Sequence, residues 1–129
     1  MSATGELESM VRALFSALDR KDFDHIVRLA TDDVQSVDEI SRGWLRGRDA
    51  MAEYLTSLED EVSNIHSALS DLNVVEVGDA GIVTFVLDQS YDIGDERTSI
   101  HAPSSIVFRR SDGEWRFVLL HSVPLADES

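Results

Sequence analysis

Two side chains in this sequence, Asp38 and His121, could exchange a proton with a bound molecule. Asp38 ends a short predicted strand, and a carboxylate at the mouth of an apolar pocket can act as a general base or acid when desolvation raises its pKa. His121 titrates near neutrality and could pair with Asp38 across a cavity. The alternatives are a solvated aspartate at a loop edge and a core histidine bonded to a neighbour. Glu39 is expected to face elsewhere, on the surface.

Other side chains could hold a ligand without reacting with it. Trp44 and Tyr54 come from the loop and helix that would wall the mouth, where amphipathic rings can stack on a ligand, and core packing is the alternative for both. Either face of strands 80–92 and 98–109 could line the pocket, because both alternations are half apolar. Exposed or cross-strand pairs are the alternative for the polar side chains of these strands. The candidates on the later strands are Gln89, Tyr91, His101, Ser105 and Phe117.

Several reaction classes lack the residues they need. The chain has no cysteine, which excludes disulfides, thiolate metal sites and a cysteine nucleophile. The four histidines have no His-x-His or His-Glu-x-x-His spacing, so no metal site is expected. A Gly-x-Ser-x-Gly elbow and a phosphate-binding glycine loop are also absent from the sequence. Proton transfer remains, and it needs no cofactor.

The composition of the chain limits the classes of molecule that it is expected to bind. The chain has 129 residues, of which 43% are apolar, and this suits one compact domain over residues 1–129. The formal net charge of -14 repels nucleic acid and anionic membrane, although solubility alone also explains the acidity. No run approaches the ~20 apolar residues of a membrane span, and no secretory signal is visible. We therefore expect a cytoplasmic protein with no nucleic-acid or membrane partner.

Three helical patterns occupy the first half of the chain. Apolar residues recur at helical spacing from about Glu6 to Arg20, with acidic residues in the first turn and basic residues in the last. A second, shorter helix is predicted over Asp22 to Ala30, with an exit at Thr31-Asp32-Asp33. Val34 to Asp38 then favours a short strand, and a third helix is predicted from about Asp49 to Leu58.

The second half is rich in β-branched and aromatic residues, and Gly-Asp or Asp-Gly turns divide it into long strands. Pro103 indicates a bulge or an edge position. Helices followed by a meander of strands indicate an α+β fold, with the helices in the concave face of a curved antiparallel sheet. The predicted strands are Val62 to Val77, Ala80 to Asp92, Thr98 to Arg109 and Glu114 to Val123.

The last strand is apolar on both sides, so both of its faces must be covered. The helices can cover one face, and a second copy of the chain is the simplest cover for the other. We therefore expect a homodimer through the outer face of the sheet. The alternation assigns Trp115, Phe117, Leu119 and His121 to one face and Val118 and Leu120 to the other.

The order of these elements resembles the nuclear transport factor 2-like superfamily, and within it the SnoaL-like and ketosteroid-isomerase-like branches. The resemblance covers a core of about residues 7–125. Its marks include the entry to the first strand, Asp32-Asp33-Val34, and the opening of the third helix, Gly47-Arg48-Asp49-Ala50-Met51. It implies a cone-shaped fold whose antiparallel sheet is mixed at one edge. The superfamily hosts isomerases, cyclases, dehydratases, hydrolases and non-catalytic modules, so the fold alone does not select a reaction.

The resemblance also bears on the site. Asp38 falls at the position of the aspartate that shuttles the proton in ketosteroid isomerases. The two groups that polarise the steroid carbonyl in that family do not carry over, because Leu14 and Ser104 occupy their positions. Steroid isomerisation is therefore not expected. Two hypotheses remain: a pocket enzyme of isomerase, cyclase or dehydratase type acting on a small apolar molecule, and a non-catalytic ligand-binding or dimeric assembly module.

Overall fold

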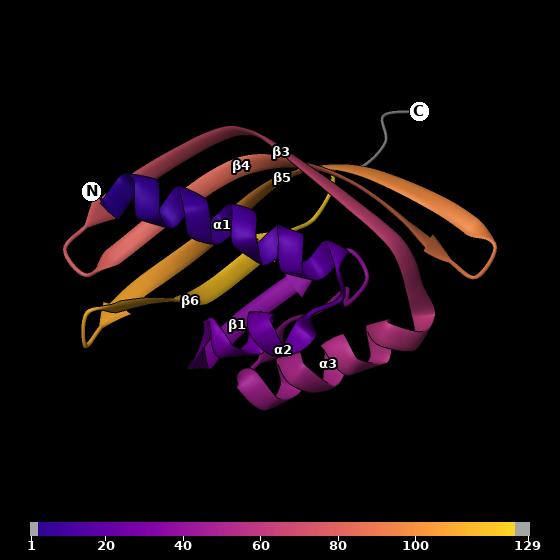
Figure 1. Ribbon diagram of the computed structural model, residues 1–129, viewed down its shortest axis with the longest axis horizontal. Helices are drawn as coiled ribbons and strands as arrows, with labels where there is room; N and C mark the ends of the chain where they lie inside the picture. Colours follow the sequence, from indigo (N-terminus) through magenta and orange to yellow (C-terminus); the bar gives the residue numbers. More distant parts are fainter. Residues whose placement is uncertain (1–2, 126–129) are drawn as a thin grey trace.

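The computed structural model describes residues 3–125, and they form three helices and one six-stranded sheet (Figure 1). The sheet curves around the first helix, and the predicted α+β fold is confirmed. No helix among these residues is long and apolar enough to cross a bilayer. The elements are α1 (Ala3–Asp19), α2 (Phe23–Arg28), β1 (Ala30–Asp38), β2 (Leu45–Arg46), α3 (Arg48–Glu61), β3 (Val62–Val77), β4 (Ala80–Ile93), β5 (Glu96–Ser111) and β6 (Glu114–Ser122).

The strands lie in the order β2-β1-β6-β5-β4-β3. The last four strands pair antiparallel with their chain neighbours, as the turn residues predict. The pair β1–β6 is parallel, which makes the sheet mixed near one edge. As a result Asp38, at the end of β1, pairs with Ser122 at the end of β6.

The first helix packs its apolar stripe on the concave face of the sheet. Leu7, Val11 and Leu14 are buried one or two turns apart, as the helical spacing predicts. Removing each such side chain from water contributes roughly 1.5–3 kcal/mol before entropy is counted. Phe15 meets Phe85 of β4 edge to face, with ring centroids 5.5 Å apart. The helix therefore joins the sheet to the rest of the core.

The predicted end of the second helix is wrong. That helix stops at Arg28, and Ala30 already belongs to β1, which runs without a break to Asp38. The cause is tertiary pairing: the Phe117 N–H donates to the Leu29 carbonyl at 2.9 Å, and Ala30 pairs with Phe117. A partner strand thus overrides the helical preference of an alanine.

Two bulges bend β3. Its register with β4 shifts between Ser63 and His66 and again between Ser70 and Asn73. Each shift inserts one extra residue, and a residue with positive φ lies inside each: Asn64 at 52° and Asp71 at 54°. Asn and Asp adopt this conformation more readily than most residues, and a bulge bends and twists its strand. These bulges help to give the sheet its concave shape.

A third bulge changes which side chains of β6 face inward. Val107 pairs with Leu119 but Phe108 pairs with Phe117, so Val118 is an extra residue. One extra residue moves every later side chain to the opposite face. The predicted single face from Trp115 to His121 is therefore wrong. Leu120 and Ser122 continue the inward face, and His121 is exposed.

Candidate functional site

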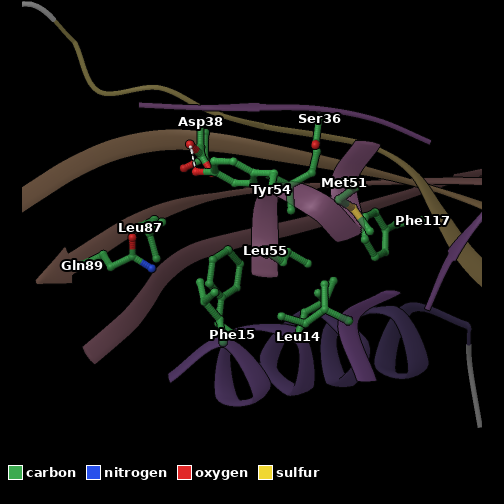
Figure 2. A pocket seen from close by; sticks show the side chains of 14 residues that line it. Leu14, Phe15, Ser36, Asp38, Met51, Tyr54, Leu55, Leu87, Gln89 and Phe117 are labelled. Carbon is green, nitrogen blue, oxygen red and sulfur yellow. Dashed lines mark hydrogen bonds between the residues drawn. The ribbon is translucent and has the colours of Figure 1, made fainter. Parts of the chain in front are cut away.

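A mostly apolar cavity lies between α1, α3 and the concave face of the sheet. About 90 Å³ of it is open to the centre of a water molecule, several times the ~10–15 Å³ that one water needs. Figure 2 shows Leu14 and Phe15, which rise from α1, opposite a wall that carries Asp38 and Tyr54. The apolar lining consists of Leu14, Phe15, Leu18, Ile26, Met51, Leu55, Leu87, Phe117 and Leu120.

A second hollow adjoins the first. The two share Asp38 and Gln89, together with Leu18, Leu55 and Ser122. The second hollow adds Glu39 and Tyr91 to the polar groups. Asp38 is therefore a wall residue of both spaces, as expected for a group that would meet a bound molecule.

The Asp38 carboxylate is held by donors from its own loop and from α3. Its Oδ1 accepts the backbone N–H groups of Ile40 at 2.9 Å and Ser41 at 2.8 Å. The Tyr54 hydroxyl lies 2.7 Å from Oδ1 and 2.9 Å from Oδ2, as the dashed lines of Figure 2 mark. Within residues 3–125, no other group donates to Oδ2. The chain thus fixes the carboxylate and leaves one of its oxygens mostly unsatisfied.

Tyr54 is placed by α3, whose buried residues Met51, Leu55 and Leu58 set that helix against the core. Burial, followed by the neighbouring Asp38 carboxylate, raises the pKa of the Tyr54 phenol. The phenol therefore keeps its proton throughout the neutral range and donates it to Asp38. Tyr54 orients the carboxylate and is not itself set up to act as a base.

A second tyrosine–carboxylate pair lies beside the first. The hydroxyl of Tyr91, a buried residue of β4, donates to the Glu39 carboxylate. Burial, and then the charge of Asp38, raise the pKa of Glu39. Glu39 was expected on the surface because strand alternation would turn it away from Asp38. The strand ends at Asp38, however, and Glu39 lies in the following turn, where alternation no longer applies.

Gln89 is oriented by a chain of hydrogen bonds from α1. Asp19 accepts the Ser67 backbone N–H at 3.0 Å and the Ser67 hydroxyl at 2.7 Å. Because the Ser67 hydroxyl donates its one proton to Asp19, its oxygen can only accept, and it accepts a hydrogen bond from Gln89 Nε2 at 3.0 Å. These hydrogen bonds require the amide nitrogen of Gln89, and not its oxygen, to face Ser67 of β3. The amide oxygen and one amide proton of Gln89 have no partner among the residues that the structure describes.

Ser36 and Ser122, both buried, complete the polar lining of the cavity. Ser122 of β6 lies 2.8 Å from the Ser104 hydroxyl, and the Ser104 hydroxyl donates to the Ala102 carbonyl at 3.0 Å. The proton between the two serines therefore comes from Ser122. Ser36 of β1 lies two residues before Asp38 and lines the same cavity. Sequence reasoning missed Ser122 as an inward residue because the bulge at Val118 was not visible.

The structure brings only some of the predicted site residues together. Asp38, Tyr54, Gln89 and Phe117 line the first cavity, and Tyr91, with Asp38 and Gln89, lines the second. On β4, the face that includes Leu87, Gln89 and Tyr91 is therefore the concave one.

The other predicted residues lie outside the cavity. His121 is exposed, so the predicted Asp38–His121 pair does not form; the His121 ring instead lies 6.2 Å from the Trp44 ring, centroid to centroid. Trp44 is 44% exposed. His101 is exposed and its Nδ1 lies 2.6 Å from Asp88 on the outer face of the sheet. Ser105 pairs with His121 across the strands and shares that outer face.

Among residues 3–125, no three histidine, aspartate or glutamate side chains converge as ligands for a metal ion. The acid–base groups of the cavity are two carboxylates, each with a tyrosine as donor. Such an arrangement can accept a proton at Asp38 and hold a molecule against an apolar wall.

A model of the SnoaL-like domain matches residues 7–126. No curated protein matches the chain. Among solved structures, a candidate dehydratase of the NTF2-like family from Streptomyces avermitilis superposes with a TM-score of 0.87 at 20% identity, covering 97% of both chains. A ketosteroid isomerase-like protein from Erwinia carotovora atroseptica gives 0.82 at 18% identity, covering 96% of this chain and 97% of that one. The CamKII hub homology domain of Chlamydamonas reinhardtii gives 0.78 at 17% identity, covering 98% and 100%.

Proposed function

The chain belongs to the SnoaL-like domain family of the nuclear transport factor 2-like superfamily, and from this premise we propose that it binds a small, mainly apolar molecule and transfers a proton on it at Asp38. The reaction is of isomerase, cyclase or dehydratase type and uses no cofactor. The observation that carries the proposal is the Asp38 carboxylate, fixed by Tyr54 and two backbone N–H groups where two hollows meet.

In this mechanism Asp38 Oδ2 accepts a proton from a carbon or oxygen atom of the substrate. The electron pair of the broken bond stays on the substrate, and Asp38 returns the proton at another atom or to a leaving group. Tyr54 keeps its own proton and holds the carboxylate in one orientation. The developing negative charge can be met by the free amide proton of Gln89 or by the Ser36 hydroxyl, both in the lining.

A thermal-shift screen of apolar ring compounds tests binding. A ligand at a hundred times its Kd adds about 2.7 kcal/mol to the unfolding free energy, which is readily detected. For a compound that is also converted, Asp38→Asn is expected to lose turnover even at ligand concentrations where binding is still measured. Asp60→Asn is the matched control, because Asp60 is exposed on α3. Turnover that survives in Asp38→Asn would remove Asp38 as the base.

A second candidate is a non-catalytic assembly module. Part of the outer sheet surface is apolar and exposed: Val75 is 46% exposed, Val77 63% and Ile82 38%. The fold likeness to a CamKII hub homology domain, a hub in its own protein, supports this candidate. Homodimerisation through the outer face is compatible with both candidates, and so is a single cytoplasmic domain. Sedimentation that gives a monomer at micromolar concentration would contradict the dimer.

A further inference from the structure

The hydrogen bonds around the cavity leave more acceptors than donors facing it. Tyr54 gives its hydroxyl proton to Asp38, and Tyr91 gives its proton to Glu39. Ser122 gives its proton to Ser104, because Ser104 has already donated to a carbonyl. A hydroxyl has only one proton, so these three oxygens can offer a ligand nothing but lone pairs.

The Asp38 carboxylate adds to the excess of acceptors over donors. As a carboxylate it is acceptor only, and its two oxygens are unequally satisfied. Oδ1 receives the N–H groups of Ile40 and Ser41 as well as the Tyr54 hydroxyl, whereas Oδ2 shares only the tyrosine proton. Oδ2 is therefore an anionic oxygen of the wall that shares a single donor with Oδ1 and can accept a further hydrogen bond.

Donors are few in the lining. One amide proton of Gln89 remains after the bond to Ser67, and the Ser36 hydroxyl is the other. These two groups can donate to an acceptor on a ligand, but neither donates to Asp38 Oδ2. A ligand that fills the hollow expels the water that would otherwise donate to Oδ2. Leaving such a group without a donor costs free energy.

We infer that the ligand of this cavity carries a hydroxyl or amine group that donates to Asp38, on an apolar ring body. A molecule of the same shape whose only polar group is a carbonyl is bound more weakly. This inference rests on the proposed function and adds the chemical class of the ligand.

The test compares 1-indanol with 1-indanone, which share one ring skeleton and differ in whether the oxygen carries a proton. Dissociation constants come from NMR titration of the labelled protein. A bond to a charged group predicts that 1-indanol binds about tenfold or more tightly than 1-indanone. 1-Aminoindane, which also donates, is expected to follow 1-indanol.

Variants tie the preference to the carboxylate. Asp38→Asn supplies an amide donor of its own, so the alcohol-to-ketone ratio should fall to about one; Asp60→Asn should leave the ratio unchanged. Tyr54→Phe removes the hydroxyl that donates to Asp38, so the preference of this variant for 1-indanol over 1-indanone should exceed that of the natural chain. Because Tyr54→Phe keeps the aromatic ring, it tests the role of Asp38 even if Asp38→Asn fails to fold.

The binding results distinguish a failure of this inference from a failure of the proposed function. Binding of 1-indanone as tight as that of 1-indanol overturns this inference and leaves the proposed ligand-binding role standing. An alcohol preference that persists unchanged in Asp38→Asn also overturns it. If none of the indane compounds binds, both the inference and the proposed role fail.

Discussion

The two ends of the concave face are built from the same helix and sheet but differ in how they are filled. At one end, Leu7 in the first half of α1 lies against Gly81 of β4, and Leu7, Val11, Val83 and Phe108 are fully buried. At the other, the second half of α1 faces a hollow that Asp38 and other polar side chains line. We call these the filled end and the hollow end.

The filled end shows how closely these elements can approach. A Cβ built on Gly81 would lie 2.5 Å from Leu7 Cδ1, so any side chain at this position would displace the end of the Leu7 side chain. At the hollow end, α3 contributes Tyr54 and β4 contributes Gln89, and both side chains need hydrogen-bond partners. The hollow end therefore differs from the filled end both in the added element that encloses it, α3, and in the polar side chains that face inward.

The largest difference between the two ends is expected when a leucine of α1 is shortened at each. Leu7→Ala removes a side chain with neighbours on all sides, and we expect a loss of about 3–5 kcal/mol in unfolding free energy. Leu14→Ala removes one that already borders empty space and has fewer contacts to lose, so about 2–3 kcal/mol is expected. Urea unfolding of both variants measures the difference.

The two leucines lie two turns apart on one helix, so each variant is the control for the other in helix propensity. Equal losses would mean that the hollow end is packed as tightly as the filled end. In that case the cavity would not be open in solution.

Most of the fold could be predicted from the sequence because it follows from periodicity and turn chemistry. The stripe of α1 and the four long strands depend on local patterns, and their predicted limits lie within a few residues of those observed. The boundary at Ala30 was missed because it is set by pairing with a strand nearly ninety residues later in the chain.

The site was harder to predict because it depends on registers. A strand alternation assigns faces correctly only while no residue is inserted, and the single extra residue Val118 turned His121 outward and Ser122 inward. Asp38 and Tyr54 were named separately, but their contact joins a strand end to a helix sixteen residues later. Nothing in the local sequence specifies that contact.

The next largest effect is expected at the hollow end, from the bond that orients Asp38. Tyr54→Phe removes a hydrogen bond to a charged group, and we expect a loss of about 1–2 kcal/mol in unfolding free energy without ligand. A double-mutant cycle with Asp38→Asn isolates the pair, and a coupling of about 1 kcal/mol is expected. Additive losses would show that the two side chains do not depend on each other in solution.

A smaller effect, with a distinctive sign, is expected from the second carboxylate of the hollow end. Burial and the Asp38 charge raise the pKa of Glu39 above its ordinary value of 4.5 in the folded chain. Folding therefore favours the protonated form, and this contribution to stability is full below pH 4.5 and is lost as the pH rises through the raised value. Glu39→Gln cannot ionise and can still accept from Tyr91.

The variant should therefore gain stability relative to the natural chain as the pH increases from 4 to 8, by less than the effect of Tyr54→Phe. Chemical unfolding at several pH values measures this gain, and Glu59→Gln on the exposed face of α3 is the control. A difference that stays constant with pH would mean that Glu39 is solvated in both states.

The smallest effect is expected at His121, and it tests the bulge that separates the outer face from the hollow end. Since His121 is exposed and touches the Trp44 ring, His121→Ala should change the unfolding free energy by less than about 0.5 kcal/mol and leave 1-indanol binding unchanged. Ser122→Val, one residue further along, replaces the hydroxyl at the wall with two methyl groups and removes the proton that the Ser104 hydroxyl accepts, so it should weaken binding. The reverse order of effects, with His121→Ala the more damaging to binding, would mean that β6 runs without an inserted residue in solution and that His121 faces Asp38 after all.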